Sequence, residues 1–162
     1  MAIYMNYDKK RIKGNVTAEG YQETINVNSF SWGVGRGISM ESGAIANREA
    51  TRPSLSEITI SKMMDNSTPG LFKESVSGDA GAEVVIEFVA TGAKKIETYM
   101  KYTLTNCLVS SYSVSADAEG KPVESLSLSY TKVLMDYCAA DATNKSGSSN
   151  KLGYDLTKGA PC

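Results

Sequence analysis

Hydrophobic and polar residues alternate along most of the chain, which is the pattern of β-strands with one buried face. Turn residues, and not helical patterns, separate most of the alternating stretches. The sequence therefore predicts a mainly β protein of antiparallel strands. The range 96–117 suits one long strand or two strands broken near Asn106, and 152–156 suits one more short strand. The other predicted strands are 2–7, 23–35, 55–64, 82–91 and 122–138.

The phase of the hydrophobic residues changes inside two of these stretches. Ile25 and Val27 occupy odd positions, whereas Phe30, Trp32 and Val34 occupy even ones, and we expect these three to face a core. A second change falls around 131–133. Such a change requires a β-bulge or a strand that leaves one sheet and joins another. Strands of the second kind form the corners of sandwiches and barrels, so we predict an antiparallel two-sheet β-barrel or sandwich.

One segment has the signals of a helix. Ser67 or Thr68 can cap its start, Pro69 suits the first helical position, and Gly78 suits the end. We predict one short helix over about 69–77 that flanks the sheets.

Two ranges lack periodicity. The range of about 36–54 is longer than structureless connections in compact domains usually are, so we predict an extended loop that is either functional or disordered. The range of about 139–162 is rich in Ser, Gly and Asn, and we predict a flexible tail there. The length suits a single domain over 1–162. The extended loop carries charges of both signs at Arg36, Glu41, Arg48, Glu49 and Arg52.

Composition excludes several functions. The 162 residues carry a formal net charge of -1 and no histidine, which argues against nucleic-acid binding, a histidine general base and imidazole metal ligands. The three cysteines, Cys107, Cys138 and Cys162, have no metal-binding spacing. We expect neither a cofactor nor an enzyme, and neither an N-terminal secretion signal nor insertion into a membrane.

The glycine-rich stretch 33–37, "GVGRG", resembles part of a phosphate-binding loop. Ile38 stands where the third glycine of that motif belongs, and no helix is predicted after it. Glycines beside bulky aromatic residues favour a bulge or a close approach of two backbones.

Small hydroxyl residues occupy the polar face of three predicted strands. Such a face can be an ordinary solvated surface, a tightly packed interface, or the wall of an aqueous channel. Three similar strands favour one shared, smooth and uncharged surface. The residues are Ser29, Ser31 and Gly33 in the first strand, Ser111, Ser113 and Ser115 in the second, and Ser125, Ser127 and Ser129 in the third.

Several of these stretches together resemble the hemolysin-coregulated protein (Hcp) family of the type VI secretion system. The resemblance runs from Ala2 to about Leu156, and it departs from the family at "KKR" in the first turn and after Tyr137. Its main segments are "IKGNVTAEGY", "INVNSFSWGVGRGIS", "PSLSEITISKMMDNSTPGLFKESVSG", "YTLTNCLVSSYSVSADAEGKPVESLSLSYTKV" and "GYDL".

The resemblance implies a structural protein with a β-barrel-like fold of two sheets flanked by a helix. It implies homohexameric rings that stack into a tube inside a contractile sheath, below a trimeric spike, with effector proteins carried in the lumen. It also implies assembly in the bacterial cytoplasm, followed by secretion through the type VI machine. Ser31 matches a lumen-facing position, and we assign Ser29 and Gly33 to the same face; the loop of Gly35 to Arg52 matches a ring-stacking loop. The alternative is an effector-binding adaptor that does not form long tubes.

Overall fold

The computed structural model describes residues 1–40, 42–43, 51–91, 96–140 and 146–162. This part of the chain forms twelve strands and one helix, so the mainly β prediction is confirmed. The elements are β1 (Ala2–Tyr7), β2 (Ile25–Val27), β3 (Ser29–Ser31), β4 (Val34–Gly35), β5 (Ser54–Leu55), β6 (Ile58–Met63), α1 (Thr68–Ser77), β7 (Ala82–Thr91), β8 (Ile96–Ser115), β9 (Val123–Ser129), β10 (Lys132–Ala140), β11 (Ser146–Asp155) and β12 (Ala160–Pro161).

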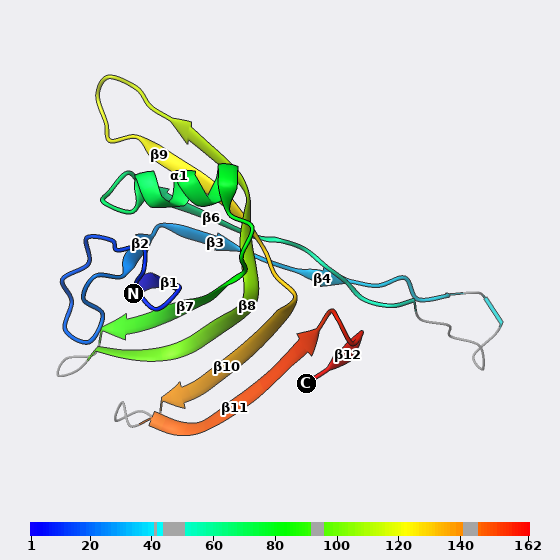
Figure 1. Ribbon diagram of the computed structural model, residues 1–162. Helices are drawn as coiled ribbons and strands as arrows, with labels where there is room; N and C mark the ends of the chain where they lie inside the picture. The colour runs from blue at the N-terminus through cyan, green and yellow to red at the C-terminus, as the bar shows by residue number, and fades with distance from the viewer. Residues whose placement is uncertain (41, 44–50, 92–95, 141–145) are drawn as a thin grey trace.

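The strands form two antiparallel sheets that share β8 (Figure 1). Sheet A has the order β12-β11-β10-β8-β7-β1-β2, and sheet B has the order β3-β6-β9-β8. Both paths have ends among the described residues, so these sheets form an open sandwich and not a closed barrel.

Strand β8 belongs to both sheets and is one long strand, not two. Its first part pairs with β7 and β10, and its second part, from Leu108, pairs with β9. The bend lies at Asn106, whose φ of 54° is in the left-handed region. Gly81 lies directly against this bend, because a Cβ at Gly81 would stand only 1.5 Å from Oδ1 of Asn106. The predicted break is therefore a sharp bend that passes the strand from sheet A to sheet B.

Both predicted phase changes are places where the chain changes sheets. Strand β2 pairs with β1 in sheet A, whereas β3 pairs with β6 in sheet B, and Asn28 lies between them. Likewise β9 lies in sheet B and β10 in sheet A, with Thr131 between them. Each change of phase keeps the apolar residues pointing into the space between the sheets.

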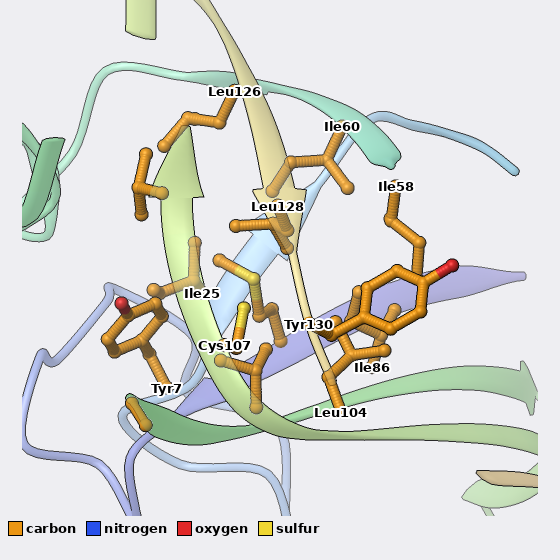
Figure 2. Close-up of a cluster of buried hydrophobic side chains, with 14 of the residues drawn as sticks. Tyr7, Ile25, Ile58, Ile60, Ile86, Leu104, Cys107, Leu126, Leu128 and Tyr130 are labelled. Carbon is orange, nitrogen blue, oxygen red and sulfur yellow. The ribbon is translucent and has the colours of Figure 1, made fainter. Parts of the chain in front are cut away.

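The hydrophobic core fills this space (Figure 2). Sheet A contributes residues such as Met5 and Ile86, and sheet B contributes Ile60 and Leu126; all four side chains are inaccessible to solvent. Burying apolar side chains of this size contributes about 1.5–3 kcal/mol each, so the core is the main force that holds the sheets together.

The helix α1 confirms the predicted helix, with details that differ from the expected capping. Ser67 occupies the N-cap position, but its hydroxyl donates to the carboxylate of Asp65 and accepts no hydrogen bond from a helix N–H. Gly78 ends the helix in an extended conformation, with φ at -69°. A side chain at Gly78 would collide with the carbonyl oxygen of Glu74, which explains the glycine without any left-handed turn.

The range 36–54 begins as a two-stranded hairpin that projects from the sandwich, which we call the arm (Figure 1). At its base β4 pairs with β5, and farther out the Thr51 N–H donates to the Gly37 carbonyl at 2.9 Å. The predicted loop is thus extended, but its first part is a hydrogen-bonded ribbon.

The predicted flexible tail over about 139–162 needs correction. Strand β11 pairs with β10 from the register Lys132↔Asp155 to Ala140↔Ser146, and β12 pairs with β11. A Ser- and Gly-rich segment has a low strand propensity, but a partner strand with free backbone groups overrides that preference.

Candidate functional site

Two rows of hydroxyl side chains cross the outward face of sheet B, and we call them the hydroxyl ladder. Each row takes one residue from each of the four strands, in direct cross-strand register. Ladder partners on one face of a sheet lie only about 4.5–5.5 Å apart at Cβ, so the eight residues form one continuous surface. The first row is Ser29, Ser61, Ser125 and Ser113, and the second row is Ser31, Thr59, Ser127 and Ser111.

The ladder is a direct result of the two-residue period of these strands. The residues between the two rows, which are Phe30, Ile60, Leu126 and Tyr112, are also cross-strand partners and point toward the core. A one-residue slip of any strand would bury hydroxyls and expose apolar side chains, so core packing fixes the register of the ladder.

The ladder is uncharged and short-chained. At all eight positions the side chain is a serine or a threonine, and Ser29 and Ser61 hydrogen-bond to each other through their hydroxyls. At one end the face continues into a partly exposed apolar pair, Met63 and Val123. At the other end a bulge places Ser110, whose hydroxyl donates to Glu57 at 2.7 Å. Such a surface offers many weak hydrogen bonds and no strong electrostatic attraction.

The three predicted surface residues do not all lie on the ladder. Ser29 and Ser31 are exposed members of its two rows. Gly33 is also exposed, but it lies beyond the end of β3, and its N–H donates to the Ser56 hydroxyl at 2.9 Å. Gly33 therefore belongs to the base of the arm.

Sequence reasoning missed one strand of the ladder, β6, which supplies Thr59 and Ser61. The signal was present, because these two residues alternate with the buried Ile58 and Ile60. A threonine and a single serine resemble an ordinary solvated strand until the register places them beside the other serines.

Trp32 joins sheet B to the base of the arm. Its indole N–H donates to the Tyr130 hydroxyl at 2.7 Å, and that hydroxyl donates to the Ser56 carbonyl at 2.7 Å. The rings of Phe30 and Trp32 both pack against Tyr102, so these two residues reach the core as predicted. The prediction for Val34 is wrong: it is 60% exposed, because β4 leaves the sandwich to form the arm.

The charges assigned to the arm are only partly described. Arg36 and Arg52 are exposed near the base of the arm. Glu41, Arg48 and Glu49 lie outside the described residues.

The described residues contain no group of three metal-ligating side chains. Cys107 is buried in the core, where burial raises the pKa of its thiol to about 12, so this cysteine is a packing residue and not a nucleophile. Cys162 is exposed at the end of the chain. Within the same ranges, no helix has both the length and the apolar composition needed to cross a membrane.

These features define a class of protein: an open β-sandwich that presents a neutral hydroxyl face and a projecting arm. The family model described as "Type VI secretion system effector, Hcp" matches residues 4–137. The chain therefore belongs to the Hcp family of the type VI secretion system.

Comparison with solved structures shows the same fold. A structure described as a type six secretion system protein has a TM-score of 0.91 at 25% identity, covering 99% of each chain. Hcp1 from Salmonella typhimurium has a TM-score of 0.75 at 21% identity, over 99% of this chain and 98% of that one. A type VI secretion system effector from Yersinia pestis has a TM-score of 0.74 at 18% identity, over 94% of this chain and 98% of that one. A search of curated proteins found no match.

Proposed function

We propose that this protein is the tube-forming subunit of a type VI secretion system. Six copies form a ring, and rings stack into the inner tube that the machine expels. The hydroxyl ladder of sheet B lines the channel of this tube, and it is the observation that carries the proposal.

The ladder suits a channel wall for a physical reason. Long charged side chains would attract or repel cargo strongly and would project into the channel. Rows of serine and threonine hydroxyls instead keep the wall hydrated and smooth, and they exchange weak hydrogen bonds with water and cargo alike. A folded effector can then be retained by many weak contacts and released without a high barrier.

The remaining roles follow from the same assembly. The partners of the protein are its own copies, a contractile sheath, a trimeric spike and secreted effector proteins. It assembles in the bacterial cytoplasm and leaves the cell through the type VI machine. It works as a structural conduit and an effector chaperone, without a cofactor and without catalysis.

The arm supplies the contact between stacked rings. Its base is held by the β4–β5 pairing, and it extends away from the sandwich with Arg36 and Arg52 exposed. Exposed charges favour contacts that are screened by salt and are readily reversed. We assign Glu41, Arg48 and Glu49 to the same stacking contact.

Native mass measurement and negative-stain microscopy of the purified protein test the assembly. We expect hexameric rings, and tubes at high concentration. Rings that never stack would favour the effector-binding adaptor, and a stable monomer at micromolar concentration would contradict both roles.

A charge on the ladder tests the lumenal assignment. We expect Ser31→Lys to leave rings intact and to reduce retention of a cognate effector by about tenfold or more, because a long ammonium would stand in the neutral wall. Thr103→Lys, on the outward face of sheet A, is the matched control and should retain the effector normally. Equal retention by the two variants would refute the assignment.

A further inference from the structure

A lysine and a glutamate lie opposite each other on the inner face of sheet B, where the neighbouring pairs are apolar. Lys62 of β6 and Glu124 of β9 are cross-strand partners, and both side chains have no exposed surface. Their Nζ and Oε1 atoms are 2.6 Å apart. The next pair along the same face is Ile60 and Leu126, which belong to the core.

The pair is the centre of a network that reaches the start of α1. The Thr68 hydroxyl, on the first residue of the helix, donates to Glu124 Oε1 at 2.7 Å. The Lys62 ammonium also lies 3.0 Å from Oδ1 of Asp65, in the segment that leads into the helix. The Tyr112 hydroxyl, from β8, donates to the other oxygen of Glu124. Three strands and the beginning of α1 are therefore joined through two buried charges.

The segment before the helix is tied to the same network. The Ser67 backbone N–H donates to Asp65 Oδ1 at 2.9 Å, and the Asp65 N–H donates to the Thr68 hydroxyl at 3.1 Å. Asp65 thus holds the turn in shape while it contacts Lys62.

Helix α1 has few other anchors. Leu71 is its only fully buried residue, whereas Phe72 and Val76 are 52% and 67% exposed. Glu74 pairs with Arg11 at 2.9 Å; the glutamate is 12% exposed and the arginine 50%, so solvent screens this pair on the arginine side and it holds the helix less firmly than a buried pair. A helix of ten residues is marginal without tertiary contacts. The buried network is therefore a large share of what holds α1 in place.

Buried ion pairs have an uneven energetic effect. Compared with apolar residues they add little net stability, but removal of one partner leaves an unpaired charge in the interior and is strongly destabilising. Here that penalty falls on the junction between sheet B and α1.

We propose that the Lys62–Glu124 pair is a latch that sets the docked position of α1. When the latch is broken, residues 64–78 open as a unit while both sheets stay folded. Opening exposes Leu71 and the surface of β8 beneath the helix. The latch is a conformational device of the single subunit, so it does not depend on the formation of rings.

Hydrogen exchange of the full chain, measured by mass spectrometry, tests the latch. We expect Glu124→Gln to accelerate exchange in 68–77 by about tenfold or more, with little change in β1 and β7. Thr68→Val removes the hydroxyl that donates to Glu124 and accepts from the Asp65 N–H, but it leaves both buried charges in place, so it should give a smaller acceleration in the same segment. Glu119→Gln removes an equal charge from the exposed β8–β9 turn and should change nothing in α1.

The Thr68→Val protein keeps the proposal refutable if the Glu124→Gln protein folds poorly. Acceleration spread evenly over β1, β7 and α1 in the Thr68→Val protein would show that the network is part of one cooperative core. Unchanged exchange in α1 in that protein would show that the helix does not depend on the latch. Either result overturns the proposal.

Discussion

The outward faces of the two sheets use opposite chemistry on the same antiparallel scaffold. Sheet B carries the hydroxyl ladder, whereas sheet A carries a row of alternating charges across β7, β8, β10 and β11. The row is Glu87, Lys101, Asp136 and Lys151, each in register with the next.

Both faces place their polar groups in cross-strand register, but with different consequences. The charged row depends on neighbours of opposite sign, such as Asp136 and Lys151, whose Oδ2 and Nζ lie 3.9 Å apart. The hydroxyl ladder depends on no particular partner, because a hydroxyl both donates and accepts. The charged face therefore requires positive and negative residues in a particular order. The hydroxyl face requires only that each position carries a serine or a threonine.

The largest effect is expected from alkaline pH. It acts on titratable groups of the interior and not on the hydroxyl ladder. Burial, helped by the hydrogen bond to Glu124, raises the pKa of Tyr112 to about 12, and burial also raises the pKa of Tyr7 above its usual range. The folded protein therefore keeps protons that the unfolded chain loses near pH 10. The buried Cys107 thiol, whose pKa is also raised, makes stability begin to fall above about pH 9, and the two tyrosines add to the fall above about pH 10, with about 1.4 kcal/mol per pH unit for each such group.

Urea unfolding at pH 9, 10 and 11 measures this dependence. Tyr112→Phe should make the decline shallower, and Ser125→Ala on the outward face should leave it unchanged. The same decline of stability with pH in all three proteins would show that groups other than Tyr112 cause it.

Charge substitutions test the contrast between the faces directly. Lys101→Glu places a carboxylate between Glu87 and Asp136, so we expect the free energy of unfolding to fall by about 1–2 kcal/mol. Ser125→Glu has only Ser61 and Ser113 as cross-strand neighbours, and it should change the free energy by less than about 0.5 kcal/mol. High salt should restore part of the first loss. Equal losses of unfolding free energy in Lys101→Glu and Ser125→Glu would show that the two faces do not differ in their response to an added charge.

The smallest effect is expected for single pairs, and its salt dependence is the informative quantity. A double-mutant cycle on Asp136 and Lys151 should give a coupling of about 0.2–1 kcal/mol that declines in salt, since Lys151 is 62% exposed. A cycle on Ser29 and Ser61 should give a coupling that salt does not change. A salt-dependent serine coupling would show that the hydroxyl face is not electrostatically neutral.

Local sequence patterns predicted most of the fold and part of the candidate site. The two-residue period located the main strands, and the phase changes at Asn28 and Thr131 located the points where the chain changes sheets. The serines of three strands were visible for the same reason. Thr59 and Ser61 became part of the ladder only through pairing, which no single strand reveals.

The features that sequence reasoning missed depend on tertiary partners. Lys62 follows the phase of Ile58 and Ile60, but a lysine in that phase shows a buried charge only when Glu124 stands opposite. Many residues of β11 have little preference for strands. The segment forms a strand because it pairs with β10. Val34 has the phase of a core residue, yet it leaves the core where the arm begins.

The bend of β8 at Asn106 has a mechanical consequence. One uninterrupted backbone of about 20 residues, Ile96–Ser115, runs through both sheets, so covalent bonds connect the hydroxyl face with the charged face. Traction on one sheet is transmitted along this backbone to the other, and sliding of the sheets past each other would stretch the chain at the bend. The sandwich should therefore carry a load as one stiff body.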